Sequence, residues 1–351
     1  MIEVGIYGAS GYMGGEALRV LSEHPEVKVV WATSRSEKSL AFFHRNFYGD
    51  KIALVGPEEI TPCDAVFFAV PTGTPMELVR SFLSRKTKVI DLGADFRLKS
   101  LSDWERIYQK KHLCPDVIQD AVYGIPELHR DAIRQTDVVA NPGCYASACI
   151  LGMAPLIKAG LVEPERIIVD GLSGTTGAGA ELDTPSHHPE IANNIVPYNV
   201  VEHRHTYEME QELGLLTTEK VTVHFTPAYV PITRGILAIC NCFPKSPVNR
   251  RDLLELYREF YHGQFFVRIF DLPPDSKSNW RYEAYPWVSA VSGTNFCHIG
   301  LDYDEKRDRI VVFSVLDSVG KGGAHAGVQN LNLLFGLDEK TGLTRHGLHP
   351  Y

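Results

Sequence analysis

The sequence predicts an α/β protein in which a doubly wound parallel sheet is followed by an α+β domain with a mixed sheet. Two observations indicate this. In the first third of the chain, short apolar runs alternate with helix-like segments, as in parallel strands joined by crossover helices. After residue 144 the apolar runs are longer and more widely spaced, which suits a mixed sheet with helices on one face. The predicted domains are residues 1–143 with 318–351, and residues 144–317.

The expected elements follow from these runs in chain order. The first domain is expected to contain the strands Ile2–Tyr7, Val27–Ala32, Ala65–Ala69, Val89–Leu92 and Val138–Ala140, separated by helices such as Gly14–Ser22 and Pro75–Leu83. The second is expected to contain the strands Ile167–Leu172, Val221–Val230, Gly235–Cys242, Val288–Ser292, Phe296–Asp302 and Arg309–Ser314, with a loose glycine-rich zone at Gly171–Asp183. Helical spacing returns over Lys321–Phe335, which is expected to pack back onto the first domain.

Composition excludes several classes of protein. The chain has 351 residues with 44% hydrophobic content, enough for real cores, and no apolar run approaches the roughly 20 residues that cross a bilayer. Its first residues show no signal-peptide charge pattern, so a soluble, cytoplasmic protein with no membrane partner is expected. Seven scattered cysteines then indicate thiols and not disulfides. A net charge of −8 argues against nucleic acid as the main partner.

A glycine-rich turn joins the first expected strand to the first expected helix. Its pattern is Gly-x-x-Gly-x-x-Gly, where Gly-x-Gly-x-x-Gly is more common. Glycines here let the backbone approach a pyrophosphate at the helix N-terminus. The turn therefore predicts a Rossmann-type dinucleotide site whose contacts are Gly8, Ser10, Gly11, Tyr12, Met13 and Gly14. A tight turn without a ligand is the alternative interpretation.

The end of the second strand selects the nucleotide. A strand that binds NAD usually ends with Asp or Glu on the ribose 2′-hydroxyl, whereas this one ends Ala32-Thr33-Ser34-Arg35. No carboxylate repels a 2′-phosphate there, and Ser34 and Arg35 can bind one. NADP is therefore the predicted cofactor, with a merely solvated arginine as the alternative for Arg35.

Cys144 follows the tight turn Asn141-Pro142-Gly143 and precedes an apolar, helix-like run from Ala146 to Leu156. A thiolate at a helix start is stabilised by the positive end of the helix. A lone cysteine is more often a small buried residue. The glycine turn upstream and a histidine pair downstream favour a cysteine enzyme that passes hydride. By contrast, Cys240 and Cys242 lie two apart in an apolar run, and core packing explains them better than metal binding.

The histidine pair lies in His203-Arg204-His205-Thr206, just before Tyr207–Leu213, which is expected to be a helix capped by Thr206. A histidine at a helix start beside an arginine can act as a general acid and base toward a thiol. Taken singly, either histidine is more often a packing or surface residue. Arg204, with Arg97 and Arg234 in turn-like contexts, is a candidate for binding an anionic substrate, although most arginines are solvated.

The whole chain resembles the N-acetyl-gamma-glutamyl-phosphate reductases of arginine biosynthesis, and their relatives in lysine biosynthesis that reduce an acyl phosphate on an amino-group carrier protein. The resemblance depends on a set of motifs in order: Gly8–Gly14, Thr33–Arg35, Asp91–Leu98, Tyr123–Leu128, Asn141–Tyr145, His203–Thr206, Pro231–Gly235, Gly293–Asn295 and Lys321–Asn330. The broader group includes aspartate-semialdehyde dehydrogenase and glyceraldehyde-phosphate dehydrogenase. A semialdehyde-dehydrogenase-like fold is therefore implied.

This resemblance also implies roles for individual residues. Cys144 would attack the acyl phosphate, release phosphate and form a thioester, which NADPH reduces to the semialdehyde through a thiohemiacetal. His205, or less readily His203, would be the acid–base group. The implied substrate contacts are Arg97, Arg204, Arg234 and Asn141, and the implied further cofactor contacts are Ser173, Gly174, Asn295, Lys321 and Gly322.

The identity of the acyl substrate stays open in the sequence. This chain resembles the arginine-pathway enzymes around Ser173–Gly179, but Ala180 replaces the arginine of their pattern. The stretch His187-His188-Pro189-Glu190 is similar to the carrier-protein branch. Asn141 and Tyr145, however, are similar to the arginine branch. An N-acetylated glutamyl phosphate, and a glutamyl or aminoadipyl phosphate on an acidic carrier protein, are both candidates. A homodimer or homotetramer is the default expectation.

Two hypotheses from other classes are also open. A zinc hydrolase would draw its ligands from a histidine-rich set, namely His187, His188, Glu190, His203 and His205. A polar loop without a ligand explains the first part of that set better, so no metal is expected. A non-catalytic NADP sensor is the second hypothesis, because a glycine turn indicates binding and not turnover.

Overall fold

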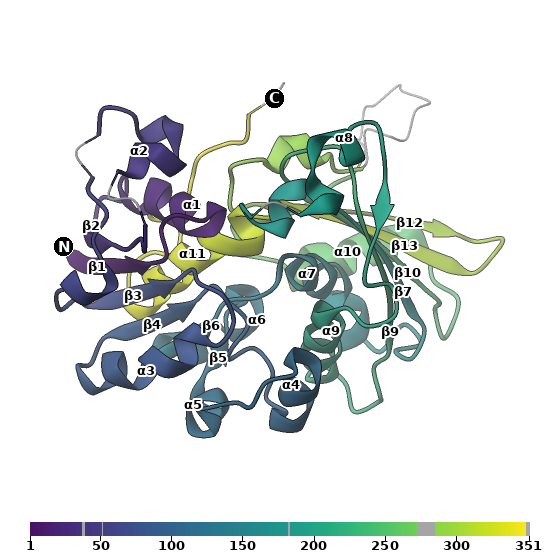
Figure 1. Ribbon diagram of the computed structural model, residues 1–351. Helices are drawn as coiled ribbons and strands as arrows, with labels where there is room; N and C mark the ends of the chain where they lie inside the picture. The colour runs from purple at the N-terminus through teal and green to yellow at the C-terminus, as the bar shows by residue number, and fades with distance from the viewer. Residues whose placement is uncertain (37–38, 51, 182, 272–284, 349–351) are drawn as a thin grey trace. The chain divides into compact units, whose positions relative to one another are not determined.

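The structure is a computed structural model that describes residues 1–36, 39–50, 52–181, 183–271 and 285–348 (Figure 1). The chain divides into two compact units, Met1–Pro142 with Gly323–Arg345, and Gly143–Gly322 with His346–Tyr351. Each unit is built on its own sheet. The predicted domains, residues 1–143 with 318–351 and residues 144–317, stay a prediction.

The first unit contains a six-stranded parallel sheet with the strand order β2-β1-β3-β4-β6-β5. Its strands are β1 (Ile2–Tyr7), β2 (Val27–Ala32), β3 (Ala65–Phe68), β4 (Lys88–Asp91), β5 (Val122–Tyr123) and β6 (Val138–Ala140). The five expected strands are confirmed, and the two-residue β5 is an addition too short to leave an apolar run. Because the chain moves outward from β1 to β2 and then returns to β3, the strand order reverses at β1, which is where doubly wound sheets bind ligands.

Helices cover both faces of this sheet. They are α1 (Tyr12–Leu21), α2 (Leu40–Phe43), α3 (Thr74–Ser84), α4 (Leu101–Tyr108), α5 (Pro115–Asp120), α6 (Pro126–Gln135) and α11 (His325–Leu334), with 3₁₀ turns at Arg45–Phe47 and Pro57–Glu59. Phe67 and Phe68 point to opposite faces because they are consecutive strand residues. Gly327 of α11 lies against Phe67, whereas Phe82 of α3 packs edge-on against Phe68 at 5.4 Å between ring centroids. The expected return of the C-terminal segment to the first sheet is thus confirmed.

The second unit contains a mixed seven-stranded sheet with the order β11-β12-β13-β10-β7-β9-β8. Its strands are β7 (Ile167–Ser173), β8 (Val196–Pro197), β9 (Val223–Tyr229), β10 (Ile236–Cys242), β11 (Val267–Ile269), β12 (Cys297–Asp304) and β13 (Arg309–Leu316). Neighbours β7 and β9 run parallel, and β10 is antiparallel to both β7 and β13. Register places Ser173 and Leu316 opposite Ile236, so the loops after β7, after β13 and before β10 emerge at one end of the sheet.

One face of the second sheet is covered by helices. They are α7 (Cys144–Lys158), α9 (Arg204–Gly214) and α10 (Arg250–Phe260), and a short helix, α8 (His188–Ile191), lies in the segment before β8. Gly152 of α7 lies close to Ser314 and Cys240, and Tyr257 of α10 donates its hydroxyl to the Gly152 carbonyl at 2.5 Å. Cys240 and Cys242 are buried in this core, as expected.

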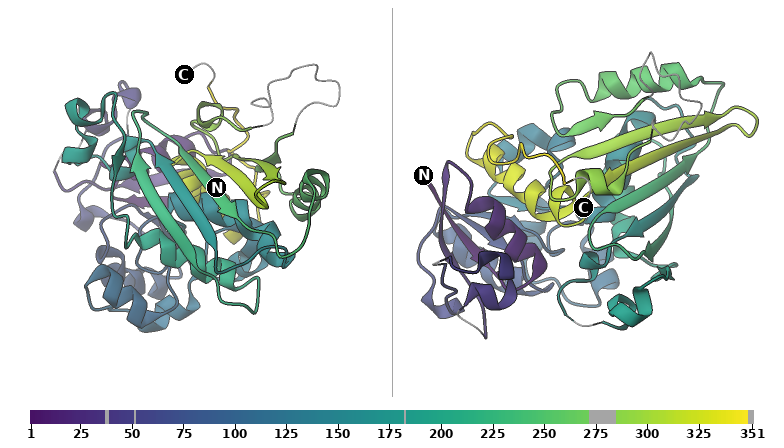
Figure 2. Two further views of the ribbon diagram at one scale, coloured as in Figure 1. Left: turned by 90° about the vertical axis from the view of Figure 1, so that its right-hand side faces the viewer. Right: turned by 90° about the horizontal axis from the view of Figure 1, so that it is seen from above.

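The opposite face of the same sheet carries a second set of apolar side chains that stay partly exposed. Buried and partly exposed residues alternate along β10 and β13, and the exposed set comprises Ile168, Leu172, Leu237, Ile239, Val311 and Phe313. The helices α7, α9 and α10 pack on the other face, whereas here the Tyr285 ring lies 4.9 Å from that of Phe313 between centroids; the strands of this face look toward the viewer in the left panel of Figure 2.

Three sequence predictions about local structure are wrong. Val288–Ser292 is a 3₁₀ turn over Val288–Val291 and not a strand, because its amides bond to carbonyls three residues back, as Ala290 does to Trp287. The segment from Lys321 begins as a π-turn over Gly320–Ala324, whose glycines do not favour an α-helix. Gly171 to Ser173 belong to β7 and not to a loose loop. Within the described ranges, every helix is too short or too polar to span a bilayer.

Candidate active site

Cys144 is the first residue of α7. Gly143 is the N-cap residue and has no side chain to cap the amides of the first helical turn. The positive end of a 15-residue helix therefore acts on the Cys144 side chain, which is partly exposed, whereas residues 145–157 of the same helix are buried. Among the seven cysteines, only Cys63 shares this partial exposure, and burial raises its thiol pKa to about 11.

The two histidines lie at the start of α9, but the cap differs from the expected one. The helix begins at Arg204, and His203 is its N-cap: the ring Nδ1 accepts a hydrogen bond from the His205 amide at 3.2 Å. Thr206 lies inside the first turn. The expectation failed because an imidazole nitrogen can act as the cap acceptor that is usually a hydroxyl or a carboxylate. Burial, with the nearby His205 and Arg204, lowers the pKa of His203 to about 3, so its ring is neutral at pH 7.

His205 packs directly on the turn that precedes Cys144. A Cβ atom at Gly143 would lie 2.3 Å from Nε2 of the His205 ring, so only glycine allows this approach. The ring also contacts Tyr145 edge-on at 5.9 Å and His203 at 4.8 Å between centroids. The sequence-predicted thiol and histidine pair therefore come together in one cluster within the second unit.

Glu208 completes this cluster, and no role was predicted for it from the sequence. Its carboxylate is fully buried, accepts a hydrogen bond from the Gly143 amide at 3.0 Å and lies 4.0 Å from Nε2 of His205. A carboxylate in this place holds the turn before Cys144 and stabilises positive charge on the imidazole. The spacing of three residues from His205 along a helix was the available signal.

The other predicted residues of the second unit lie at the end of β7, on the loops before β12 and after β13, and at the start of α9, with mixed exposure. Ser173 is buried and donates its hydroxyl to the Gly174 carbonyl, and Gly174 is close to Thr233. Asn295 is fully buried, and the buried Lys321 amine lies 5.6 Å from the centre of the Phe266 ring. Arg204 is exposed.

Arg234 and Gly322 occupy the same end of the sheet. The Arg234 guanidinium pairs with Asp317 at 2.9 Å, and Asp317 is a second buried acid that the sequence analysis did not single out. A Cβ atom at Gly322 would lie 2.7 Å from the Cβ of Cys144, so this turn touches the thiol residue. Ser318 joins the loops by accepting a hydrogen bond from the Gly235 amide at 3.1 Å.

The glycine turn of the first unit has the shape of a dinucleotide loop. Gly8 has a φ of 99°, in the range that favours glycine, and a Cβ at Gly14 would lie 2.2 Å from the Gly8 carbonyl oxygen. Gly11 is the N-cap of α1 and has open space where a side chain would be. Of the other predicted contacts, Ser10 and Met13 are partly exposed, and Tyr12 is exposed.

Two further residues hold this turn in place. The Thr33 hydroxyl accepts a hydrogen bond from the Gly8 amide, and the Thr33 carbonyl accepts one from the Ala9 amide, both at 2.9 Å. On the outer side, Nε2 of His44 lies 2.8 Å from the Ala9 carbonyl. Thr33 belongs to the Thr33–Arg35 motif, but no contact with the glycine turn was predicted for it, and no sequence signal indicated His44.

The predicted phosphate contacts differ in exposure. Ser34 is buried, and its hydroxyl oxygen accepts a hydrogen bond from the Ser36 amide at 3.3 Å. Arg35 is exposed, and its charge, together with that of Glu58, acts on the hydroxyl of Tyr7, whose pKa is raised mainly by burial. No carboxylate follows β2 directly, which fits a nucleotide with a 2′-phosphate.

Arg97 and Asn141 are buried at the ends of β4 and β6. Nε of Arg97 donates to the Asn141 carbonyl at 2.7 Å, and its Nη2 donates to the Leu92 carbonyl at 3.1 Å. The Asn141 amide donates to the Gly323 carbonyl at 3.0 Å. Both residues hold the strand ends and the turn before α11 together, and the substrate contacts that the resemblance implies for them stay a prediction.

A pair of carboxylates lies beside Arg97. Asp91 accepts hydrogen bonds from the amides of Gly93 and Asp95, at 2.9 and 3.2 Å, and Asp95 accepts from the Gly73 amide at 2.9 Å. Burial raises the pKa of both carboxyls, to about 7 for Asp91, where the charge of Asp95 adds to the effect, and to about 6 for Asp95.

The histidines that a zinc site would use do not form a cluster with Glu190. His187, His188 and Glu190 are exposed on and beside α8. Across the residues that the structure describes, no three His, Cys, Asp or Glu side chains are grouped so that they could hold a metal ion.

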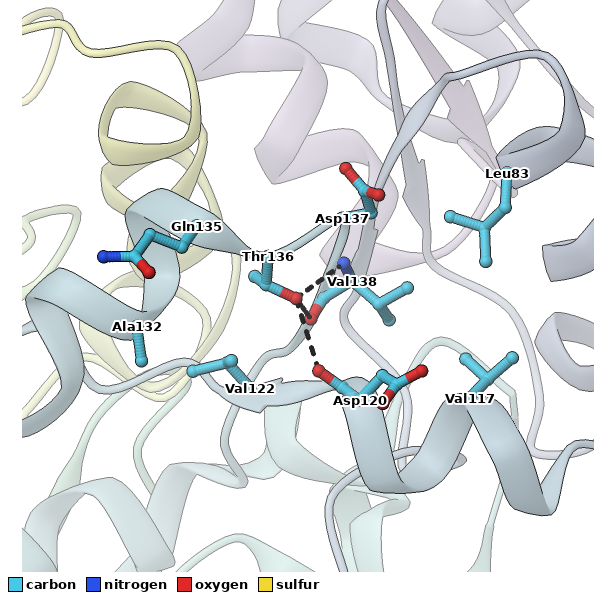
Figure 3. A pocket seen from close by; sticks show the side chains of 9 residues that line it. All are labelled: Leu83, Val117, Asp120, Val122, Ala132, Gln135, Thr136, Asp137 and Val138. Carbon is cyan, nitrogen blue, oxygen red and sulfur yellow. Dashed lines mark hydrogen bonds between the residues drawn. The ribbon is translucent and has the colours of Figure 1, made fainter.

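The hollow of Figure 3 lies in the first unit, away from the carboxyl ends of the strands. It is lined by Leu83, Val117, Asp120, Val122, Ala132, Gln135, Thr136, Asp137 and Val138, at the amino ends of β5 and β6. None of the predicted site residues lines it. The Thr136 hydroxyl is already bonded to the Asp120 and Val138 carbonyls, at 3.4 and 3.1 Å.

Comparison with known proteins agrees with this arrangement. Residues 3–136 match the semialdehyde dehydrogenase NAD binding domain, and residues 144–318 match the semialdehyde dehydrogenase dimerisation domain. The N-acetyl-gamma-glutamyl-phosphate reductase of Desulforudis audaxviator is 42% identical over 356 residues, covering 100% of both chains. That of Methanopyrus kandleri is 44% identical over 358 residues, again covering 100% of both chains.

The chain belongs to the N-acetyl-gamma-glutamyl-phosphate reductase family. Aspartate-semialdehyde dehydrogenase II of Vibrio cholerae, solved in complex with ASA, has the same fold, with a TM-score of 0.69 at 20% identity over 95% of this chain and 98% of that one. The family, the fold class, the reductase class and the nicotinamide cofactor predicted from the sequence are confirmed. The lysine branch, the cytoplasmic location and the individual site residues stay predictions.

Proposed function

We propose that this reductase converts an N-acetylated γ-glutamyl phosphate to the semialdehyde with release of phosphate, through a thioester on Cys144 and with NADPH as reductant. The observation that carries the proposal is the Cys144–His205–Glu208 cluster at the start of α7, in a chain at least 42% identical to two named reductases over their full lengths. The reaction is the step of arginine biosynthesis that the resemblance implied.

The glycine turn fits a dinucleotide on two observations. Open space at Gly11 leaves room for the pyrophosphate at the N-terminus of α1, and the first turn of that helix contains no acidic residue to repel it. Gly8, Ser10, Gly11, Tyr12, Met13 and Gly14 would hold the pyrophosphate, and Ser34 and Arg35 the 2′-phosphate. When bound, NADPH supplies the hydride that reduces the thioester.

Cys144 acts as the nucleophile in this proposal. The positive end of α7 stabilises its thiolate, and the sulfur attacks the acyl carbon of the substrate. The carbon–oxygen bond to phosphate breaks, and inorganic phosphate leaves with both electrons of that bond. The amide dipoles at the start of α7 point along the helix axis and also favour negative charge on the carbonyl oxygen during the attack.

His205 is the proposed acid–base group, and Glu208 orients it. The imidazole takes the thiol proton and later donates a proton to the thiohemiacetal oxygen, while the buried Glu208 carboxylate stabilises its positive charge. His203 is neutral and serves as the helix cap, which sets the position of His205.

Arg204 and Arg234 are the proposed anion contacts of the second unit, and Asn295, Ser173, Gly174, Lys321 and Gly322 the proposed further contacts of the cofactor. A free small substrate is favoured over one held by an acidic carrier protein. Residues 181–202, which lead to His203, contain Glu181, Asp183, Glu190 and Glu202 and no lysine or arginine. An acidic partner would be repelled at this segment.

Self-association through the second sheet is also proposed. The partly exposed apolar side chains of Ile168, Leu172, Leu237, Ile239, Val311 and Phe313 lie together on one face of the sheet, and such grouped apolar residues are typical of an interaction surface. A second copy offers the same flat face, and the matched family model for residues 144–318 is described as a dimerisation domain.

The direct test runs the reaction in reverse. Phosphate-dependent reduction of NADP in the presence of N-acetylglutamate semialdehyde should be measured for the unaltered protein, for Cys144→Ser and for Cys63→Ser as the matched control. The proposal requires activity in the first and third and its loss in the second. Activity that survives in Cys144→Ser, or turnover only with carrier-linked substrate, would contradict the proposal.

A further inference from the structure

Asp317 is a fully buried carboxylate just after β13, where the loops before β10, before β12 and after β13 meet. Its Oδ1 accepts hydrogen bonds from the amides of Val319 and Gly320, at 2.9 and 3.2 Å, and its Oδ2 accepts one from the Gly293 amide. The Arg234 guanidinium binds both oxygens, with Nε 3.2 Å from Oδ1 and Nη2 2.9 Å from Oδ2.

We propose that Asp317 is the positioning residue that holds Arg234 in its anion-binding orientation and the turn at Gly320–Gly322 against Cys144. The inference rests on the proposed function, in which Arg234 is a contact of the anionic substrate. It assigns to Asp317 no contact with the substrate, because its carboxylate is buried whereas the Arg234 side chain is 21% exposed.

The geometry of the pair makes the charge of Asp317 necessary. Two parallel N–H···O bonds fix a guanidinium in one plane, which a single contact does not. Within the part of the chain that the structure describes, the hydrogen bonds to the Asp317 carboxylate come from N–H donors, so an amide in its place would point its own N–H group at another donor. Arg234 would then lose one of its two bonds.

The same residue is connected to the thiol through the backbone. The Asp317 carbonyl accepts a hydrogen bond from the Gly322 amide at 2.9 Å, and the Lys321 amide donates to the Thr294 carbonyl at 3.2 Å. A Cβ atom at Gly320 would lie 2.3 Å from the Thr294 carbonyl oxygen, so the turn is closely packed. Because Gly322 lies against the Cβ of Cys144, movement of the Asp317 carboxylate would reach the thiol.

The test uses inorganic phosphate as the probe and needs no turnover. Alkylation of Cys144 by iodoacetamide is followed by peptide mass spectrometry at increasing phosphate concentrations. Phosphate is expected to slow alkylation of the unaltered protein, and Asp317→Asn to raise the half-protecting concentration about tenfold, which is the size expected for one charge-assisted hydrogen bond. Asp302→Asn is the matched control, because Asp302 also pairs with an arginine, Arg250, at 3.4 Å in the same unit.

A double-mutant cycle separates positioning from general stability. Arg234→Lys removes the two-bond contact and keeps the charge, so it should also raise the half-protecting concentration. The half-protecting concentration of the double variant should be no higher than that of the more impaired single variant, because both changes break the same contact. Additive losses, an unchanged half-protecting concentration in Asp317→Asn, or an equal rise in Asp302→Asn would overturn the inference.

Two further outcomes keep the inference distinct from the proposed function. If Asp317→Asn fails to fold, as judged by its melting curve, Arg234→Lys is the deciding variant. An unchanged half-protecting concentration in Arg234→Lys would show that the Arg234–Asp317 pair has no role in anion binding. Absence of phosphate protection in the unaltered protein also overturns the inference. In either case, NADP reduction that depends on Cys144 would leave the proposed reaction standing.

Discussion

The turn between β1 and α1 keeps its shape through main-chain contacts, whereas the surroundings of Cys144 depend on buried charged side chains. In the turn, Gly8 and Gly14 touch each other's backbone, and the Thr33 hydroxyl and carbonyl bind two of its amides. Around Cys144, Glu208 and Asp317 each bind backbone amides and lie next to a cationic or basic side chain. The first region is therefore sensitive to added volume and the second to lost charge.

The largest expected effect comes from Glu208→Gln, which keeps the size of the side chain and removes its charge. The turn before Cys144 would keep an acceptor, but the His205 imidazolium would lose its carboxylate. We expect the kcat/KM for the acyl phosphate to fall about 100-fold, the scale of general acid–base catalysis.

The matched control is Glu212→Gln, one turn further along α9, where the buried carboxylate accepts a hydrogen bond from the Gln211 side chain at 2.8 Å. An equal fall in kcat/KM in Glu208→Gln and Glu212→Gln would contradict the role of Glu208. The surroundings of Cys144 would then not depend on this particular charge.

A pair of glycine substitutions tests the first region. In Gly14→Ala the new methyl group would lie 2.2 Å from the Gly8 carbonyl oxygen, so we expect the free energy of unfolding to fall by about 1–3 kcal/mol. In Gly11→Ala the methyl group meets open space, so stability should change by less than about 0.5 kcal/mol while the KM for NADPH rises.

Thermal unfolding and cofactor kinetics measure these two effects separately. A Gly11→Ala variant with an unchanged KM for NADPH would show that no cofactor approaches the N-cap of α1.

Arg35→Asp tests the nucleotide specificity of the same region. An exposed arginine replaced by a carboxylate removes a contact with the 2′-phosphate and repels it, so the KM for NADPH should rise about tenfold, and the KM for NADH should fall or stay constant. Arg45→Asp, a similar change at another exposed arginine of this unit, is the control for net charge. Equal effects on both cofactors would contradict the role of Arg35.

The last prediction for this region concerns pH and the Asp91–Asp95 pair. Because burial raises both pKa values above those of the unfolded chain, the folded state binds more protons there. The contribution to stability is fully present below about pH 4 and is lost as the pH rises through about 6 to 7. Asp91→Asn should therefore weaken the fall in unfolding free energy between pH 5 and pH 8. Denaturant titrations at several pH values measure the change of unfolding free energy with pH. An identical change in the unaltered protein and in Asp91→Asn would contradict the raised pKa of Asp91.

The sequence predicted the architecture well because strands, helices and the glycine turn leave local patterns. The five parallel strands, the Gly8–Gly14 turn and the start of α7 at Cys144 all follow from apolar runs and glycine spacing. The strand prediction at Val288–Ser292 was wrong because a segment this short has no periodic pattern that distinguishes a strand from a 3₁₀ turn.

The missed residues share a different cause. Glu208, Asp317, Thr33 and His44 bind amides or carbonyls that are distant in sequence, so only the folded chain brings them together. An acidic residue in a helix or loop is usually solvated, and nothing local distinguishes a buried one. His203 likewise acts as a cap, a role for which hydroxyl and carboxylate side chains are the usual choice.

The central claim is that Cys144 carries the acyl group during the reaction. The protein should be mixed with N-acetyl-γ-glutamyl phosphate in the absence of NADPH, with phosphate release followed in time and the intact mass recorded. The account predicts a burst of one phosphate per active site and a matching acyl adduct on the Cys144 peptide, both absent in Cys144→Ser. A full burst in Cys144→Ser, or turnover by the unaltered protein with no adduct at Cys144, would contradict it.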